Sequence, residues 1–276
     1  MGILLRWMLL LLVAAGCVGN PEPPESRLVV EGVISTGGYP VVTLSRSITP
    51  SGGGGALEDA LVRWGKVTIS DGDTTVILTG GPDSSQLPPY SYYSYGIRGE
   101  AGRTYVMEAE YGENRVRSIS RMMSPTPVDS INVSRIEGND TLRRAVLWFT
   151  APDDCPAYYV VRLRKSRSKM HLMPCLFGTV AATQPGVAAS VPVFMPKMKF
   201  AEGHYDSDLH VGDTLEIALS RVERDVYDFW RAYSNVVVSS SGADFLGAPP
   251  NLPGNITGGY GIWGAEAHSL RTLIVR

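Results

Sequence analysis

Four polar residues alternate in the C-terminal half and are the first candidates for a metal site. They are His204, Asp206, Asp208 and His210, and on a strand this spacing would put all four side chains on one face. At a rise of about 3.3 Å per residue the outer two would stand roughly 20 Å apart, so one ion could not reach all four. A metal site needs three or four convergent ligands. We therefore expect a solvated polar edge here and no bound metal.

Motifs that announce a reaction are missing from the sequence. It holds no Gly-x-Ser-x-Gly turn, no His-Glu-x-x-His pair and no glycine loop of the kind that holds phosphate. The four histidines include none beside an evident nucleophile. Asp71 and Asp73 flank Gly72 and are better explained as turn formers than as calcium ligands. The sequence therefore favours a protein that is not an enzyme and needs no cofactor.

A group of tyrosines is the strongest candidate for a recognition loop. Tyr90, Tyr92, Tyr93 and Tyr95 follow two consecutive prolines. Clustered tyrosines offer rigid amphipathic surface that could stack on a sugar ring or hold a peptide or protein partner. The alternative is that two of them pack inward as strand residues. Both interpretations stay open at this point.

The charge balance argues against a nucleic-acid ligand. The 276 residues carry 25 Lys and Arg against 27 Asp and Glu, a formal net charge of −2. Domains that bind nucleic acid normally show a basic stripe or a high isoelectric point. We expect no nucleic-acid partner.

The start of the chain predicts a lipid anchor. Residues 1–6 carry one positive charge, and residues 7–15 are an apolar run too short for a transmembrane helix, which needs about 20 such residues. The small residues Ala15 and Gly16 come next, directly before Cys17. This order resembles the bacterial lipobox, in which the cysteine is acylated; a plain secretory signal with an incidental cysteine is the alternative. We expect a signal peptide over residues 1–16, a proline-rich tether over 17–26 and membrane attachment through Cys17.

Two further cysteines, Cys155 and Cys175, follow in the second half. Disulfides persist where exported proteins work, so a bridge between the two is one option. Two buried free thiols are the other, because the spacing fixes no geometry.

Most of the remaining chain alternates apolar and polar residues with the two-residue period of β-strands. Leu28, Val30 and Ile34 would share one face of a strand, and Tyr105, Met107 and Ala109 would share one face of another. Glycine and proline turns separate these runs, and the prolines in residues 122–127 mark a boundary. The pattern predicts an all-β protein with two tandem immunoglobulin-like β-sandwich domains, over residues 27–123 and 127–276.

One amphipathic helix is expected in the second domain, at about residues 221–234. Val222, Val226, Phe229 and Tyr233 step by four and three, which gives one apolar stripe to pack on the sandwich. Ser220 and Glu223 have the spacing of a capping box at its start.

The segment after the helix is rich in proline, glycine and asparagine and is predicted to clamp onto the core. Prolines fix the φ angle, and glycines let two backbones approach closely. Asparagine side chains can form hydrogen bonds with backbone groups that have no partner in a β-sheet. A binding loop is the alternative. The structural signature consists of Asn251, Pro253, Asn255, Gly258, Gly261, Trp263 and Gly264.

The same tail carries the most specific part of a resemblance to a known family. Its runs are RDVYDFW at 224–230, PPNLPGNI at 249–256 and GGYGIWGA at 258–265. Earlier matches are LVVEG at 28–32, VTLSRS at 42–47, GEAGRTY at 99–105 and PVDSI at 127–131. Together they resemble the Bacteroidota outer-membrane lipoprotein family known as domain of unknown function 4249.

The resemblance implies an outer-membrane lipoprotein, but it does not say on which side of that membrane the protein lies. No catalytic residues are established for the family, so none is carried over. Relatives of this kind are often associated with TonB-dependent transporters. We therefore expect a non-enzymatic accessory or binding subunit of such a transporter. A glycan- or surface-binding adhesin is the alternative.

Overall fold

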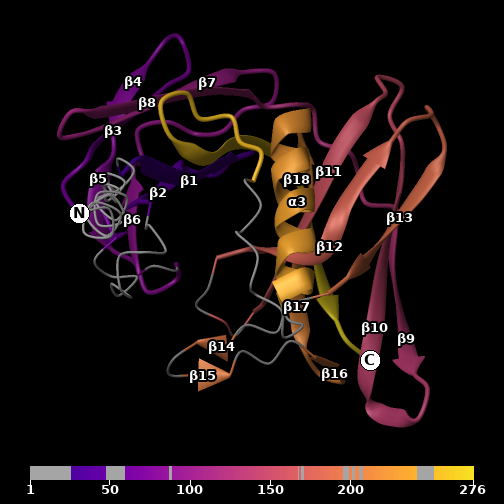
Figure 1. Ribbon diagram of the computed structural model, residues 1–276. Coiled ribbons are helices and arrows are strands. Elements are labelled where there is room, and N and C mark those ends of the chain that lie inside the picture. The colour runs from indigo at the N-terminus through magenta and orange to yellow at the C-terminus, as the bar shows by residue number, and fades with distance from the viewer. Residues whose placement is uncertain are drawn as a thin grey trace, which may run out of the picture.

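A computed structural model gives the fold (Figure 1). Cys17, Asp206 and Asn251 lie outside the part of the chain that it describes, as does nearly all of the predicted tether. The described residues are 26–47, 60–86, 89–166, 168, 171–194, 199–200, 203–204, 208–240 and 252–276.

The protein is all-β and sandwich-like, as predicted, with a helix in its second half. The helix is α3 (Arg224–Ser240). The strands of the first half are β1 (Leu28–Ser35), β2 (Val41–Arg46), β3 (Lys66–Ser70), β4 (Thr75–Ile77), β5 (Thr79–Pro82), β6 (Tyr90–Tyr93), β7 (Thr104–Tyr111) and β8 (Asn114–Arg121). Those of the second half are β9 (Ser130–Ile136), β10 (Asn139–Thr150), β11 (Ala157–Lys165), β12 (Met173–Ala182), β13 (Ala188–Val193), β14 (Lys199–Phe200), β15 (Gly203–His204), β16 (Leu209–His210), β17 (Thr214–Val222) and β18 (Tyr260–Ile274).

One sheet runs through both halves of the chain. Its eight strands lie in the order β12-β11-β17-β18-β1-β2-β6-β5. The 15-residue strand β18, yellow in Figure 1, joins the halves: its first part pairs in parallel with β1, and its second part pairs antiparallel with β17. The predicted boundary near residues 122–127 separates β1–β8 from β9–β17. Strand β18 pairs with members of both groups.

Two smaller sheets cover the same face of this large sheet. The sheet β4-β3-β7-β8 packs on the first half, where Ile34, Met107 and Trp263 are buried in one core. The sheet β13-β10-β16, with β9 paired to β10, packs on the second half, where Leu147 and Leu219 lie in another core. The alternation seen in the sequence is the cause, because every second residue of strands such as β1, β3 and β8 is buried.

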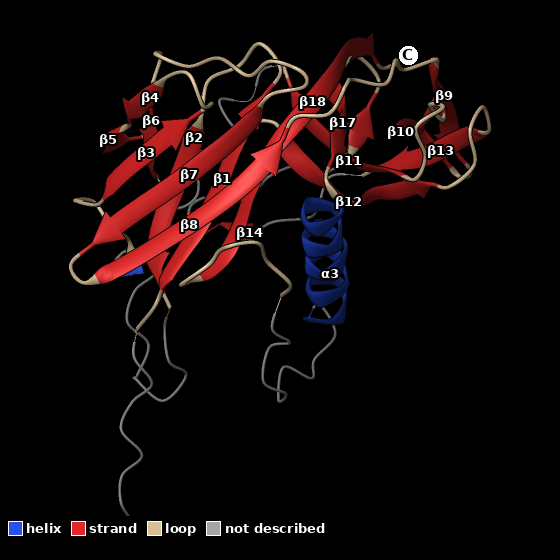
Figure 2. Ribbon diagram, turned by 90° about the horizontal axis from the view of Figure 1, so that it is seen from above, coloured by secondary structure: helices blue, strands red, loops and turns tan. Residues whose placement is uncertain are grey.

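The helix covers part of the opposite face of the large sheet. It contacts β11, β12 and β18, and Figure 2 shows it below β12. Its apolar stripe packs as predicted: Val226, Phe229 and Trp230 form a third core with Val160 of β11 and Ile262 of β18.

The helix begins later than the sequence suggested, and the predicted capping box is wrong. Ser220 is buried in the ladder of β17, between Val160 and His268. Glu223 is the residue that precedes the helix, and its carboxylate accepts hydrogen bonds from Ser120 Oγ at 2.9 Å and Arg121 N at 2.7 Å. Pairing of β17 through Val222 therefore overrides the local capping pattern, and Glu223 ties the start of the helix to β8.

The chain segments next to the two edges of the large sheet touch each other. His171, just before edge strand β12, donates its backbone N–H to Ser85 O at 3.2 Å. The ring Nε2 of His171 lies 3.3 Å from Asp83 Oδ2, just after the opposite edge strand β5. The sheet is therefore curved, and the face that α3 partly covers is its concave side.

Candidate functional site

A cleft of about 770 Å³ occupies this concave face. Its floor is the face of β1, β2, β11, β17 and β18 that points away from the two small sheets. Helix α3 forms one wall of the cleft. The other wall contains Tyr39, Tyr93 and Tyr95, together with the contact between Asp83 and His171. Cavities of this size hold small-molecule ligands in other proteins.

The floor of the cleft contains a buried ion pair between strands that are not neighbours. Arg162 of β11 reaches across β17 to Glu266 of β18, with Nε 2.7 Å from Oε2 and Nη2 2.6 Å from Oε1. His268 Nε2 lies 3.1 Å from the same Oε2. Burial acts to raise the pKa of Glu266, but Arg162 and His268 outweigh it and hold that pKa well below its usual range. Glu266 is therefore a fixed carboxylate.

Aromatic side chains of α3 line the wall above this pair. The guanidinium of Arg162 lies 5.0 Å from the ring centre of Trp230, within the range of a cation–π contact. Trp230 in turn stands edge-on to Tyr233, with ring centres 5.6 Å apart. Gly264 of β18 lies opposite, where an added Cβ would come within 3.3 Å of Val226. The missing side chain lets the helix approach the floor closely.

Glu31 of β1 is the third charged residue on the floor. Its side chain is exposed to the cleft, between Thr43 of β2 and Ile262 of β18. Partial desolvation raises the pKa of its carboxyl; Arg162 opposes this shift and Glu266 adds to it. Within the described part of the chain, Glu31 has no hydrogen bond or ion pair.

The other charged groups of the cleft are paired. Arg164 and Glu216 approach to 2.7 Å near its outer end. Asp83 accepts hydrogen bonds from the backbone N–H of Ser85 and from Ser91 Oγ, the latter at 2.8 Å. It also faces the ring of His171. Burial acts to raise the pKa of Asp83, but these hydrogen bonds lower it to about 2. The far wall is thus held together by an ionised carboxylate.

The four tyrosines of the predicted recognition loop divide between core and cleft. Tyr92 is buried and Tyr90 packs against the same core, with their hydroxyls donating to Val62 O and Arg63 O at 2.9 and 2.8 Å. Tyr93 and Tyr95 line the cleft, and Tyr95 is 73% exposed. Inward packing is therefore confirmed for Tyr90 and Tyr92, and a recognition role stays a prediction for Tyr93 and Tyr95.

A residue from another part of the chain completes the tyrosine group at the cleft. Tyr39 stands edge-on to Tyr95 with ring centres 4.9 Å apart. Its hydroxyl accepts two hydrogen bonds from Arg98, at 2.9 and 2.7 Å. Tyr39, Tyr93 and Tyr95 are called the tyrosine rim below.

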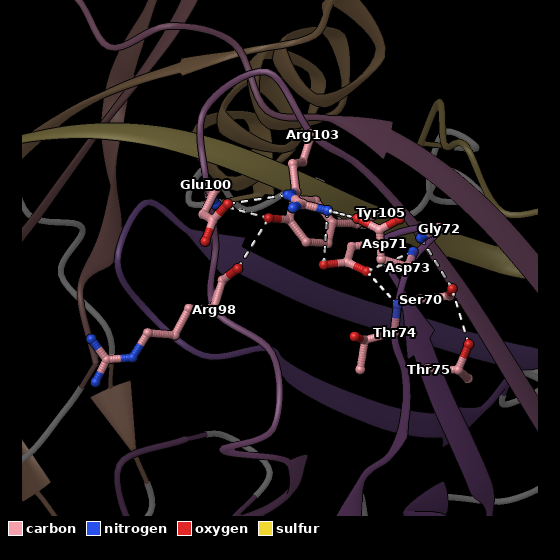
Figure 3. Close-up of polar contacts among 10 residues, drawn as sticks. All are labelled: Ser70, Asp71, Gly72, Asp73, Thr74, Thr75, Arg98, Glu100, Arg103 and Tyr105. Atoms are coloured by element: carbon pink, nitrogen blue, oxygen red, sulfur yellow. Dashed lines mark hydrogen bonds and ion pairs between the residues drawn. The ribbon is translucent and has the colours of Figure 1, made fainter.

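Asp71 and Asp73 form a turn held by Arg103 (Figure 3). Asp71 Oδ1 accepts the backbone N–H groups of Asp73 and Thr74 at 3.1 and 2.8 Å. The N–H of Thr74 does most to lower the pKa of Asp71. Arg103 Nη1 lies 2.6 Å from Asp73 Oδ2, and its Nε lies 3.1 Å from Glu100 Oε2. The carboxylates therefore serve the turn between β3 and β4.

The alternating residues of the second half do not lie on one strand. His204 ends β15 and His210 ends β16, which belong to different sheets. Where the structure describes the chain, no three His, Cys, Asp or Glu side chains converge as metal ligands would.

Cys155 and Cys175 are free thiols in the structure. Cys155 Sγ donates to Pro152 O at 3.1 Å. Cys175 is buried in the second core, and burial raises the pKa of its thiol. Of the two options that the sequence left open, the structure has the second, although Cys155 is half-buried.

The C-terminal signature holds β18 in place. Asn255 donates Nδ2 to Trp263 O at 2.8 Å and accepts Trp263 N at 2.9 Å, so its side chain acts as a short strand partner. Gly261 has φ +105°, and an added Cβ would stand 1.9 Å from Val30 O. The indole of Trp263 is buried and donates to Tyr105 O at 3.2 Å. Gly258 also has positive φ, while Pro253 is exposed.

Sequence reasoning missed the charged floor of the cleft. The available signal was a charged residue inside an otherwise apolar strand run: Glu31 after Val30, Arg162 after Val161, and Glu266 after Ala265. Charged side chains are rarely buried without a partner, so each marks a strand position that needs one.

Three further observations bear on identity. No helix among the described residues has the length and apolar character to cross a membrane. A search of curated proteins finds no relative. The family model described as a domain of unknown function (DUF4249), however, matches residues 19–269, which is most of the chain. The protein belongs to the DUF4249 family.

Proposed function

We propose that this protein is a lipid-anchored, ligand-binding subunit of the cell envelope that works without catalysis beside a TonB-dependent transporter. The observation that carries the proposal is the cleft of about 770 Å³, with its charged floor and aromatic walls. Such concave sites with a few fixed polar groups are the usual form of a ligand site.

Binding is favoured over catalysis by the state of the charged groups. A general acid or base should have a pKa near the working pH. Asp83 and Glu266 instead have lowered pKa values because neighbouring donors fix them as carboxylates. Both serve to hold the walls and floor in place.

The proposed lipid anchor and the proposed transporter partner are both inferred from the sequence. The order Ala15, Gly16, Cys17 after an apolar run supports lipidation, and the family resemblance supports an outer-membrane location and a transporter partner. The long strand β18 gives the cleft a rigid floor made from both halves, which suits a subunit that presents a ligand to another protein.

Co-purification from the native host tests this function. An affinity-tagged copy is extracted in mild detergent, and an unrelated lipoprotein with the same tag is the control. We expect a TonB-dependent transporter to be enriched with this protein alone. Recovery without any transporter would contradict the proposal.

A glycan-binding adhesin is the second candidate, supported by the tyrosine rim. Tyr93 and Tyr95 offer rings at the mouth of the cleft on which a sugar could stack. A glycan array with wild-type protein and with Tyr95→Ala tests it, with Tyr260→Ala, an exposed tyrosine on β18, as control. The adhesin hypothesis requires glycan binding that Tyr95→Ala abolishes and Tyr260→Ala leaves intact.

A further inference from the structure

We propose that the cleft binds a small organic cation, whose ammonium or guanidinium group pairs with Glu31. This inference rests on the proposed binding function and names the chemical class of the ligand. Its basis is the one charged group of the cleft that has no partner within the described chain.

All but one of the cleft's charged side chains have a partner of opposite charge or a set of hydrogen-bond donors. Arg162 is paired with Glu266 at 2.6 Å, and Arg164 with Glu216 at 2.7 Å. His268 and His171 face carboxylates at 3.1 and 3.3 Å. Glu31 is the exception in the described part of the chain. A ligand that neutralises the floor therefore carries positive charge.

The position of Glu31 is unfavourable for a carboxylate without a ligand. It projects into the cleft from β1, an inner strand of the large sheet, rather than from an edge strand. Burial and the charge of Glu31 together raise the pKa of Tyr233, so the carboxylate is close enough to act on that hydroxyl. A carboxylate that is partly desolvated in a cleft gains more from a partner of opposite charge than one on an open surface does.

The surroundings of Glu31 favour an organic cation. Trp230 already carries the guanidinium of Arg162 against its ring, which shows that this wall accepts a flat cation. Tyr233 and the tyrosine rim present further rings toward the same space. Aromatic faces attract ammonium and guanidinium groups, and they also bury the apolar body of an organic ligand.

Phenethylamine and its neutral counterpart 2-phenylethanol are suitable probes, because they differ mainly in one positive charge. Ligand-observed NMR titrations on the purified protein give both dissociation constants. We expect phenethylamine to bind at least about tenfold more tightly, the size of a charge-assisted hydrogen bond. In Glu31→Gln the two probes should bind within about twofold of each other.

Two further variants separate the possible failures. Glu113→Gln removes one charge from the exposed turn between β7 and β8 and should keep the preference for phenethylamine. Val33→Trp fills the cleft next to Glu31 and should weaken both probes. Unchanged circular dichroism of each variant establishes that it is folded.

The charge assignment is overturned if wild-type protein shows no preference for phenethylamine, or if the preference survives in Glu31→Gln. The location of the site is overturned if Val33→Trp binds both probes as tightly as the wild type does. Loss of both probes in Val33→Trp without a charge preference would still support a ligand site in the cleft. The transporter partnership is tested by co-purification and the cation site by the titrations. Failure of one therefore does not decide the other.

Discussion

Arg162 and Glu266 join two strands that do not touch. Their side chains meet across β17 through two hydrogen bonds of 2.7 and 2.6 Å, and both are almost fully buried. The pair lies where β18 passes from pairing with β1 to pairing with β17. It therefore fastens the second half of the sheet to the strand that the first half shares.

Removing one partner of this pair should destabilise the protein strongly. In Arg162→Met the carboxylate of Glu266 stays buried with His268 alone, which costs about 3–5 kcal/mol of unfolding free energy. Urea denaturation of purified protein measures it. The matched control is Arg164→Met, whose pair with Glu216 is partly exposed and should cost less than about 1 kcal/mol.

A double replacement tests the cause of that loss. Arg162→Met with Glu266→Leu removes both charges of the pair and should recover most of the stability. If the double variant is as unstable as Arg162→Met alone, the loss comes from packing against Trp230 and not from the unpaired charge.

Glu31→Gln should stabilise the protein at neutral pH. The folded state raises the pKa of Glu31, so it binds a proton more readily than the unfolded chain does. Wild-type stability therefore falls as the pH rises from the ordinary glutamate pKa through the raised one. The glutamine variant lacks this loss, so its advantage should be present at pH 7 and absent at low pH.

Urea denaturation at several pH values measures the difference between the two proteins. A difference that is the same at every pH would mean that the charge of Glu31 costs the fold nothing. If Glu31→Gln is more stable than the wild type and no longer binds a cation, then Glu31 lowers stability in return for ligand binding, as residues at binding sites often do.

The strands could be predicted from the sequence because burial has a local signature. Tyr105, Met107 and Ala109 alternate with polar residues and are all fully buried. The helix was predicted for the same kind of reason, since Val226 and Phe229 lie on one stripe. Its start was placed too early, because the spacing of Ser220 and Glu223 carries no information about the ladder of β17.

The cleft could not be predicted in the same way. Arg162 and Glu266 are 104 residues apart, and their contact depends on which strands lie on either side of β17. The parallel pairing of Val29 with Tyr260 has no local signature either, because the same alternation would suit an antiparallel partner. A charge within an apolar run shows that a partner is needed but not where it lies.

Cys17→Ser should release the protein from the membrane fraction. The serine cannot carry the acyl chains that hold a lipoprotein at a bilayer. Fractionation of cells that express either form, followed by immunoblotting, measures the change. Cys155→Ser is the control, because that thiol lies far along the chain from the predicted lipidation site. A Cys17→Ser protein that stays with the membrane would contradict the anchor.

Asn255→Ala should loosen the attachment of the tail. The change removes two hydrogen bonds and leaves the backbone N–H and C=O of Trp263 without their partner. Each half-buried group left in this way costs about 1–3 kcal/mol, so the variant should lose at least 2 kcal/mol or so of unfolding free energy. Asn114→Ala, at the exposed first residue of β8, is the control and should change the stability little.

Gly261→Ala should prevent the two halves from joining. Gly261 has φ +105°, and a Cβ there would stand 1.9 Å from Val30 O, inside the parallel pairing of β1 and β18. Neither backbone can move without breaking that ladder, so we expect insoluble protein or the loss of several kcal/mol of stability. The matched control is Gly72→Ala, where φ is +95° but no atom lies within 4 Å of the added Cβ. It carries the backbone strain alone, about 1 kcal/mol. Expression yield and urea denaturation of the two variants compare them, and equal stability would mean that β1 and β18 are not paired in this register.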